Sequence, residues 1–350
     1  VEECGAPMVS IPGGEPLIHK EIDQIVAALV ERKRFVYLCT NALLMEKKLD
    51  LFKPTPYLTF SVHLDGLEAH HDKAVDRDGT FKKAVSAIKA AKARGFRVNV
   101  NSTLFNDVKP NEAAAFFDFA ADELEVDGIT VSPGYAYERA PDQQHFLNRK
   151  QTKSLFRSIF SQRASKKKWQ FSHSPLYLDF LTGNQEYHCT PWSTPTRNVF
   201  GWQRPCYLLG EGYVPTFKQL MEETVWEQYG TGNYEKCADC MAHCGYEGSA
   251  VADTFANPLK ALWISLRGPR VKGEMAPEID LSDQRPAEDV HEQIVDAAMD
   301  RIERTGDANI GLELKDFMPT AAQVASARAS EQTEKARASQ QSEKARAEAA

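Results

Sequence analysis

The sequence lacks long hydrophobic runs and a surplus of positive charge. No apolar stretch approaches the roughly 18 residues that a membrane-spanning helix needs, and the first residues show no signal-peptide pattern. Acidic residues outnumber basic ones, 49 to 42, which gives a formal net charge of −7. A general nucleic-acid-binding protein would carry a basic face. We therefore expect a cytoplasmic protein that does not bind nucleic acid.

An initial Met is also missing, and so are aromatic residues after Phe317. Strand-like sequence begins within eight residues of Val1, from which we expect a chain that has lost its N-terminus. The last residues are rich in Ala, Glu, Lys and Arg and have no apolar stripe to bury. We expect residues 301–350 to form a helical or disordered tail without chemistry of its own.

Strand-like and helix-like patterns alternate through the first 145 residues. Segments with apolar residues at helical spacing separate short apolar runs, which lie at 8–11, 35–38, 57–63, 96–100 and 129–131. Strands that alternate with helices of this length are typical of a parallel sheet built from βα units. The predicted fold class is α/β, with an open sheet or partial barrel over residues 1–145 and a smaller cysteine-rich domain over residues 146–300.

Polar and conformationally special residues follow each predicted strand. They are Gly13, Gly14, Glu15 and Pro16, then Cys39, Thr40 and Asn41, then His63 and Asp65, then Asn101, and finally Ser132. Barrels of parallel strands have their active site at the carboxyl ends of the strands, so we expect these clusters to share one site. Loops that follow strands are usually polar, so a single cluster is weaker evidence for an active site than the whole set.

The motif G-G-E-P at 13–16 is similar to the methionine-binding motif of radical S-adenosylmethionine (SAM) enzymes. H-L-D-G at 63–66 and N-S-T at 101–103 resemble the middle of the same family's core, although many members have Ser where His63 stands. The resemblance implies a partial TIM-type (β/α)6 radical SAM barrel that lacks its first strand in this chain. It also implies a SAM site at Gly13, Gly14, Glu15, Pro16, Thr40, Asn41, His63, Asp65, Asn101 and Ser132, where the Glu15 carboxylate can pair with the ammonium group.

Members of this family hold a 4Fe-4S cluster with a C-x3-C-x2-C triplet that precedes the G-G-E-P motif. The chain has no such triplet there, since only Cys4 lies before Gly13. We therefore expect the cluster ligands upstream of Val1, with a degenerate relative as the alternative.

Five of the seven cysteines lie between residues 189 and 244, namely Cys189, Cys206, Cys237, Cys240 and Cys244. Closely spaced thiolates can converge on one soft metal centre. The C-x11-G-x4-C stretch that begins at Cys189 is similar to auxiliary-cluster domains of several radical SAM subfamilies. We expect a second Fe-S cluster or zinc here, to which His188 or His243 could contribute, and cysteines that merely pack are the alternative.

Four longer strings narrow the resemblance. L-C-T-N-A-L-L at 38–44, S-P-G-Y-A-Y-E-R-A-P-D-Q at 132–143, F-G-W-Q-R-P-C-Y-L at 200–208 and C-A-D-C-M-A-H-C-G-Y-E at 237–247 resemble the hopanoid-biosynthesis branch of the family, the adenosyl hopene transferases. The resemblance implies addition of a 5′-deoxyadenosyl radical to the alkene of hopene (diploptene), which forms adenosylhopane. An electron donor such as flavodoxin or ferredoxin is implied as a partner.

Radical addition to an alkene leaves a carbon radical, which must receive one hydrogen atom. A thiol suits this step because its S–H bond is weaker than the C–H bond that forms. Cys39, at the end of a predicted strand, is the expected donor, and a buried core cysteine is the alternative.

Two other functions stay open, a peptide-modifying radical SAM enzyme with an auxiliary Fe-S cluster and a non-catalytic, metal-stabilised binding protein. Arg163 and Lys166 to Lys168 form a basic cluster beside Trp169. Such a cluster could contact an anionic membrane, so a location peripheral to the inner membrane is also considered. A solvated loop is the plainer interpretation of these charges.

Overall fold

The computed structural model describes residues 1–135, 144–162 and 168–287. The predicted tail over residues 301–350 lies outside these ranges, as do Arg163, Lys166 and Lys167 of the predicted basic cluster. Residues 1–196 and 202–287 form one compact unit. The predicted domain boundary at residue 145 falls inside this unit and stays a prediction.

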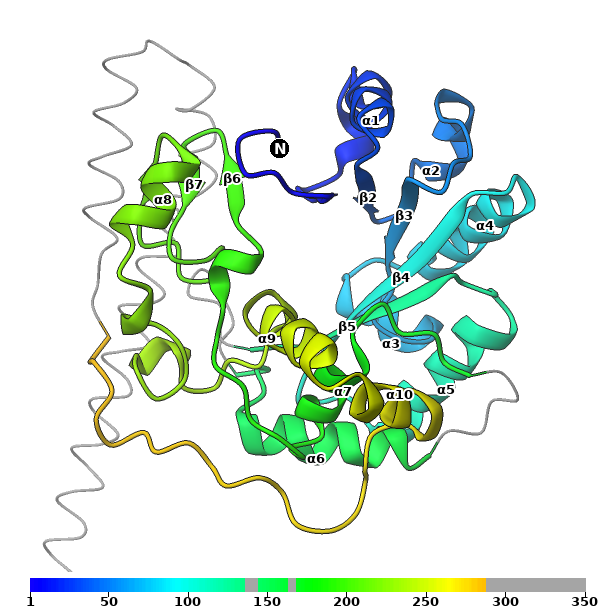
Figure 1. The fold of residues 1–350 in the computed structure, drawn as a ribbon. Helices are drawn as coiled ribbons and strands as arrows, with labels where there is room; N and C mark the ends of the chain where they lie inside the picture. Colours follow the sequence, from blue (N-terminus) through cyan, green and yellow to red (C-terminus); the bar gives the residue numbers. More distant parts are fainter. Residues whose placement is uncertain (136–143, 163–167, 288–350) are drawn as a thin grey trace, which may run out of the picture. The chain divides into compact units, whose positions relative to one another are not determined.

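A parallel sheet of five strands dominates the first part of the chain (Figure 1). In spatial and chain order, the strands are β1 (Met8–Ile11), β2 (Phe35–Thr40), β3 (Leu58–His63), β4 (Arg97–Leu104) and β5 (Gly128–Pro133). Their connections contain α1 (Ile22–Glu31), α2 (Met45–Lys48), α3 (Glu68–Ala74), α4 (Thr80–Ala93) and α5 (Pro110–Asp122). The predicted α/β partial barrel is confirmed, with strand bounds that differ from the predicted ones by a few residues.

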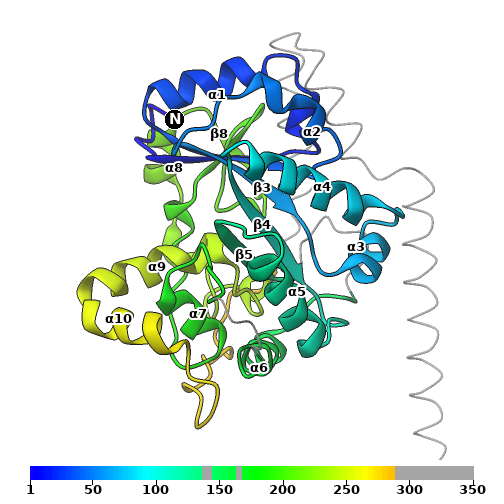
Figure 2. The same cartoon turned by 90° about the vertical axis from the view of Figure 1, so that its right-hand side faces the viewer.

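The helices pack on one face of this sheet (Figure 2). Side chains alternate between the two faces of a strand, and the apolar half of β2 to β5 points toward the helices. The sheet contributes Val36, Leu38, Phe60, Val62, Val98, Val100, Ile129 and Val131 to this core, and each is almost completely buried. Full burial of such a side chain stabilises the fold by about 1.5–3 kcal/mol. The opposite face of the sheet is consequently left for polar side chains.

The chain returns to the sheet after α6 (Arg149–Phe160). The backbone N–H of Ile129 donates to the carbonyl of Gln170 at 2.7 Å, and that of Ser172 donates to the carbonyl of Ile129 at 2.9 Å. This bridge is parallel, so residues 170–172 occupy the place of a rudimentary sixth strand beside β5. The half-barrel therefore reaches into the region that the sequence assigns to a separate domain.

The chain after the sheet is less regular. Its further elements are α7 (Pro175–Leu181), β6 (Thr196–Asn198), β7 (Gly201–Gln203), β8 (Tyr213–Val214), α8 (Phe217–Glu223), α9 (His243–Ala256) and α10 (Pro258–Arg267). Strand β7 pairs with β8 in an antiparallel arrangement. Helices α7, α9 and α10 pack against one another. In the part of the chain described by the structure, no helix has both the length and the apolar character needed to cross a membrane.

Candidate functional site

The face of the sheet opposite the helices is polar. In register across the strands, Cys39 of β2 lies beside Ser61 of β3, and Ser61 lies beside Asn99 of β4. The same alternation places further polar side chains on this inner face, namely Ser10, Tyr37, Thr59, His63, Asn101, Thr103, Thr130 and Ser132. Hydroxyl, amide and thiol groups therefore line this inner face, whereas the face beneath the helices is apolar.

Glu15 joins the ends of β1 and β2. The Thr40 hydroxyl lies 2.9 Å from each carboxylate oxygen, and the backbone N–H of Asn41 donates to Oε2 at 2.9 Å. The N–H of Leu17 donates to Oε1 at 3.0 Å. These contacts bring Glu15, Thr40 and Asn41 together as the sequence predicts, and they fix the position of a half-buried carboxylate at the edge of the sheet.

The glycines beside Glu15 leave open space. Gly13 has φ of 123°, which side-chain-bearing residues rarely adopt, and a Cβ at Gly13 or Gly14 would meet no heavy atom within 4 Å. Pro16 begins the 3₁₀ turn Pro16–Ile18 and pre-sets its backbone. An exposed glycine pair next to a fixed carboxylate suits the approach of a ligand that carries an ammonium group.

His63 and Asp65 form a second polar pair, at the end of β3. His63 Nε2 lies 2.8 Å from Asp65 Oδ2, and Asp65 Oδ1 accepts the backbone N–H of Thr103 at 2.8 Å. Burial opposes a charge on the imidazole, but the hydrogen bond and negative charge of Asp65 outweigh it and raise the pKa of His63. Asn101 lies beside His63 in the register of β3 and β4, so the predicted cluster is assembled here.

Asp72, a buried carboxylate between β3 and α4, has a structural role. Asp72 accepts the backbone N–H of Gly79 at 2.6 Å and that of Phe81 at 2.8 Å, at the start of α4. These hydrogen bonds hold the pKa of Asp72 below its usual value. Asp72 therefore satisfies N–H groups that would otherwise lack a partner at the start of a helix.

Cys39 lies on the inner face, next to the Glu15 cluster. Its Sγ is 3.3 Å from the Ser10 hydroxyl, and its side chain is partly exposed. Burial raises the pKa of the thiol, and the charge of Glu15 adds to this effect, while hydrogen bonds with Ser10 and Ser61 act against it. The thiol consequently keeps its proton at neutral pH.

Ser132 links the sheet to the cysteine-rich part of the unit. Its hydroxyl lies 2.7 Å from Nδ1 of His243, the first residue of α9. Next to it, His173 accepts the N–H of Val131 through Nε2 and contacts Glu247 through Nδ1 at 3.0 Å. Burial lowers the pKa of His243 to about 4, and the neighbouring His173 contributes, so the His243 imidazole is neutral.

The five late cysteines lie in one neighbourhood. Cys206, Cys240 and Cys244 pack together with Leu208 and Ala242, and a Cβ at Gly245 would lie 2.8 Å from Cys189 Sγ. Burial raises the pKa of all five thiols, to about 12 for Cys240. The other four cysteines all contribute to the shift at Cys189. As the described side chains stand, no three of His, Cys, Asp or Glu are arranged to hold a metal ion.

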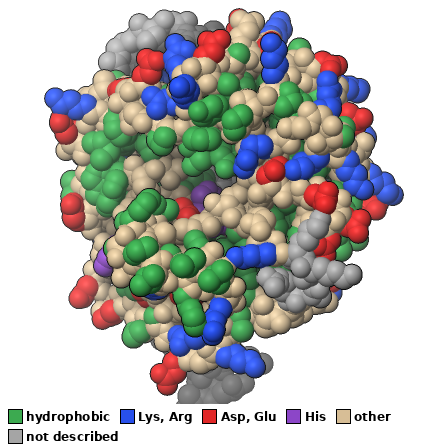
Figure 3. Space-filling view, turned by 45° about the vertical axis from the view of Figure 1, so that its right-hand side comes forward, with side chains coloured by type: hydrophobic (Ala, Val, Ile, Leu, Met, Phe, Trp, Pro, Cys, Tyr) green, Lys and Arg blue, Asp and Glu red, His purple; other side chains and the backbone are tan. Residues whose placement is uncertain are grey.

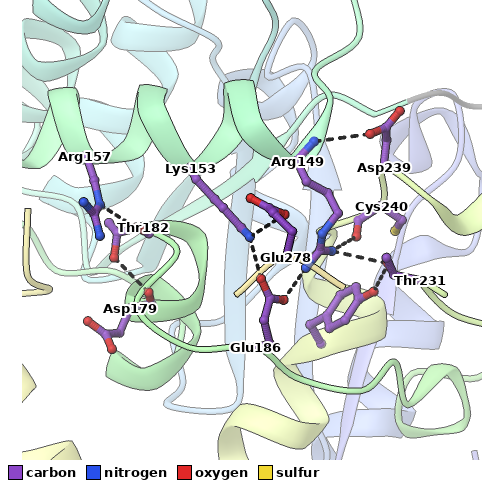
Figure 4. A network of polar contacts seen from close by, with 11 residues as sticks. Arg149, Lys153, Arg157, Asp179, Thr182, Glu186, Thr231, Asp239, Cys240 and Glu278 are labelled. Carbon is purple, nitrogen blue, oxygen red and sulfur yellow. Dashed lines mark hydrogen bonds and ion pairs between the residues drawn. The ribbon is translucent and has the colours of Figure 1, made fainter. Parts of the chain in front are cut away.

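A buried ion network supports the loop that carries Cys240 (Figure 4). Arg149 and Lys153 lie one turn apart on α6, and both contact the Glu186 carboxylate. Arg149 also donates to the backbone carbonyl of Cys240 at 2.8 Å. Lys153 is fully buried and reaches Glu278 at 3.1 Å. Spacing along the chain does not predict this network, because α6, Glu186 and Cys240 are far apart in the sequence.

Two family models match the chain. The model of the radical SAM superfamily matches residues 1–120. Residues 1–120 belong to this superfamily. A second model, described as a domain of unknown function (DUF3463), matches residues 129–264, which include the five late cysteines. The radical SAM superfamily uses a 4Fe-4S cluster and SAM, and these are the predicted cofactors.

The chain is also similar to proteins named GTP 3′,8-cyclase. The Synechocystis sp. (strain ATCC 27184 / PCC 6803 / Kazusa) protein is 24% identical over 235 residues, which cover 64% of this chain and 71% of the relative. A Listeria monocytogenes serotype 4b (strain CLIP80459) protein is 30% identical over 122 residues, 34% of this chain and 37% of the relative. The chain thus spans little more than a third of the Listeria relative.

Two solved structures are also similar. Native anSMEcpe with bound AdoMet and a Cp18Cys peptide aligns over 74% of this chain and 86% of that chain, with a TM-score of 0.45 and 16% identity. Streptococcus suis SuiB aligns over 51% of this chain and 43% of that chain, with a TM-score of 0.42 and 18% identity.

The residues of the radical SAM region fit one of its two cofactors. The open Gly13–Gly14 loop beside a fixed Glu15 carboxylate suits the ammonium group of SAM. The C-x3-C-x2-C triplet that holds the cluster in this family is not among the 350 residues, and we assign none of them to it.

Several residues of the inner face are not among the predicted site residues. Ser10 and Ser61 contact the Cys39 thiol, and the alternation of polar and apolar residues in their strands is the signal that could have found them. His173 and Glu247 have no such signal, because they lie 74 positions apart.

Proposed function

We propose that this chain adds the 5′-deoxyadenosyl group of SAM to the terminal alkene of hopene (diploptene) to form adenosylhopane. The main support for this proposal is the location of the Cys39 thiol near the Glu15 cluster. A protonated, partly exposed thiol lies on the inner face, directly before Thr40, which holds the Glu15 carboxylate. Radical addition to an alkene leaves a carbon radical, so it requires a hydrogen-atom donor next to the SAM site. The four long strings that resemble adenosyl hopene transferases supply the identity of the acceptor.

The reaction uses SAM as a substrate. A reduced 4Fe-4S cluster, whose expected ligands are not among these residues, would supply the electron that cleaves SAM into methionine and the 5′-deoxyadenosyl radical. A C–C bond then forms between C5′ and the terminal alkene carbon, and the alkene π bond is lost. The remaining unpaired electron lies on the tertiary carbon of the triterpene.

Cys39 completes the reaction. Its S–H bond breaks, and the hydrogen atom forms the new C–H bond of adenosylhopane. The sulfur radical that remains on Cys39 returns to the thiol by taking up one electron and one proton. Flavodoxin or ferredoxin is the proposed source of that electron.

The other inner-face residues bind and orient SAM in this proposal. Glu15 accepts the ammonium group, while Gly13 and Gly14 allow the backbone to approach the ligand. Asn101, Ser132 and the His63–Asp65 pair provide hydrogen-bonding groups at the ends of β3, β4 and β5.

The late cysteines are proposed to bind a second Fe-S cluster or zinc. Their support is proximity, since Cys206, Cys240 and Cys244 pack together and Cys189 lies against Gly245. Arg149 fixes the carbonyl of Cys240 and so steadies the loop between Cys237 and Cys244. Anaerobic purification with iron, sulfide and zinc analysis tests this proposal, and a metal-free, fully folded protein contradicts it.

The test of the main proposal is product analysis. The protein from the complete gene is reconstituted anaerobically and given SAM, a reductant and diploptene, and adenosylhopane is sought by mass spectrometry. In D₂O the Cys39 thiol exchanges its proton, so we expect one deuterium in the product. Formation of 5′-deoxyadenosine without adenosylhopane contradicts the proposed acceptor.

GTP is the acceptor to compare in the same assay, because the relatives in the sequence comparison are named GTP 3′,8-cyclases. A peptide is the third acceptor class. Its precursor gene would be sought next to the gene for this chain. Turnover of GTP in place of diploptene replaces the proposal with the nucleotide reaction.

A further inference from the structure

Helix α10 turns its apolar stripe toward solvent. Leu259, Leu262, Trp263 and Leu266 follow the spacing i, i+3, i+4, i+7, which places them on one side of the helix. All four are exposed, with Leu259 at 81% and Leu266 at 73%. The residue that α10 buries is the small Ala261. A helix that serves only the core would present the leucines inward.

The end of α9 extends this apolar surface. Phe255 is 81% exposed, and Val251 lies one turn earlier with 38% exposed. Together with the four residues of α10 they form what we term the α9–α10 apolar surface. Figure 3 shows hydrophobic side chains gathered on the lower part of this face, with Lys and Arg at their border. Contiguous apolar surfaces of this kind mark sites of interaction with proteins or membranes.

Basic residues outnumber acidic ones around the surface. Residues 251–274 contain Lys260, Arg267, Arg270 and Lys272 against Asp253 and Glu274, in a chain whose net charge is −7. Lys260 lies 2.9 Å from the Asp253 carboxylate, which compensates its charge, so Arg267, Arg270 and Lys272 supply the positive surplus. The Arg267 guanidinium lies 3.7 Å from the centre of the Trp263 ring, so a cation and an interfacial aromatic residue are paired. Lys168, the described lysine of the predicted basic cluster, donates to the carbonyl of Ser265 on α10.

This charge pattern discriminates between occupants. A second copy that docked through the same surface would bring two surfaces with a positive surplus together, because a two-fold interface places a patch against itself. An anionic surface attracts these cations. Leucine and tryptophan beside lysine and arginine are typical of helices that lie in the plane of a membrane interface.

We propose that the α9–α10 apolar surface docks on an anionic phospholipid bilayer, with Leu259, Leu262, Trp263 and Leu266 inserted among the acyl chains and Arg267, Arg270 and Lys272 at the headgroups. The inference rests on this surface and does not depend on the proposed acceptor. Helix α9 has 14 residues and a length of about 21 Å, and its first residue, His243, contacts Ser132 of the inner face. Docking would therefore hold the polar inner face within about one helix length of the bilayer.

Vesicle sedimentation tests the proposal on the full chain. Wild-type protein is mixed with vesicles of phosphatidylcholine alone or with 30% phosphatidylglycerol, at low and high salt. We expect binding that increases with the anionic lipid and weakens with salt, since surface charges are screened. The double variant Leu259→Ser, Leu266→Ser is expected to bind about tenfold or more weakly, because each leucine contributes through its buried apolar area.

The matched control is Leu51→Ser, which removes a 47% exposed leucine on another part of the unit. It should bind as the wild type does. Because the altered side chains are exposed, all variants should keep the far-ultraviolet circular dichroism of the wild type. Brominated lipids should quench wild-type tryptophan fluorescence more than that of Trp263→Phe.

Three results would overturn the inference. They are no binding to anionic vesicles, equal binding of the double variant and the wild type, and a dimer in sedimentation equilibrium that the double variant abolishes. The last outcome would assign the surface to a second copy. Vesicle binding requires no turnover, so a failure of the proposed reaction leaves this test unaffected.

Discussion

The thiol of Cys39 lies 3.3 Å from the hydroxyl of Ser10, and the two side chains come from adjacent strands on the inner face of the sheet. Ser10 pairs in register with Tyr37, two residues before Cys39, so both side chains point to the same side. The contact places the thiol at the polar inner face, away from the apolar core beneath the helices.

The first prediction concerns Cys39→Ala. Without the S–H bond, SAM cleavage should continue, while adenosylhopane formation falls by about tenfold or more, a loss of over ~1.4 kcal/mol in transition-state stabilisation. Radical side products should accumulate. The measurement is parallel quantification of 5′-deoxyadenosine and adenosylhopane. Cys4→Ala is the control and should leave the yields of 5′-deoxyadenosine and adenosylhopane unchanged. An unaltered adenosylhopane yield in Cys39→Ala would contradict the donor role.

The second prediction concerns thiol reactivity. The raised pKa of Cys39 keeps it protonated, and only the thiolate reacts with iodoacetamide. At about pH 8, labelling of Cys39 in the folded protein should be slower than in urea, where its pKa returns to about 8.5. Peptide mass spectrometry measures both rates. The folded protein's rate should also rise at a higher pH than the unfolded one's, and coincident pH profiles would contradict the shift.

The third prediction concerns Glu15→Ala. This change removes the acceptor for Leu17, Thr40 and Asn41 and the proposed partner of the SAM ammonium group. SAM affinity should fall by about 1.5–3 kcal/mol, which is the usual range for hydrogen bonds to charged groups. Equilibrium dialysis with labelled SAM measures the change. Glu21 is an exposed acidic residue nearby, and Glu21→Ala serves as the control. A SAM affinity of Glu15→Ala equal to that of the wild type would rule out the role of Glu15 in SAM binding.

The fourth prediction concerns the buried network of Figure 4. Glu186→Ala removes a partner from both Arg149 and Lys153, which are almost completely buried. Breaking a buried ion pair on one side costs about 3–5 kcal/mol, so the free energy of unfolding should fall by that amount. Glu112→Ala breaks an exposed pair with Lys109 and should cost about 0–1 kcal/mol. Urea unfolding compares the two, and equal losses would show that burial contributes nothing.

The fifth prediction concerns pH. The pKa of His63 is raised in the folded protein, so its pair with Asp65 stabilises the fold fully below the unfolded pKa of about 6.5. This contribution disappears as the pH rises through the higher folded value. His63→Gln should therefore destabilise the protein more at about pH 5.5 than at about pH 9. A destabilisation that is larger at high pH would reverse the sign and contradict the raised pKa.

Much of the fold could be predicted because it follows local rules. Alternating residues in β3 and β4 and helical spacing in α4 each depend on a few neighbouring positions. Parallel strands place their carboxyl ends at one edge, which brings Glu15 to Thr40 and His63 to Asn101. The parallel sheet alone is therefore enough to predict that these pairs of residues lie close together.

Other contacts had no signal in the sequence. Residues 170–172 return to β5 after a helix, and the predicted boundary at residue 145 gives no hint of this. The Ser132–His243 contact joins residues 111 positions apart, and Arg149 reaches the carbonyl of Cys240 across 91 positions. No periodicity or spacing encodes such contacts.

The βα alternation, the polar ends of the strands and the late cysteine group follow from residue type and from spacing along the chain. Which polar groups meet and which apolar residues stay exposed follows instead from the packing of segments that are distant in the sequence. Helix α10 shows the difference, since its leucine stripe has the spacing of a core helix. Only packing against α7 and α9 through Ala261 turns that stripe toward solvent, because the direction of a helix face is set by its neighbours.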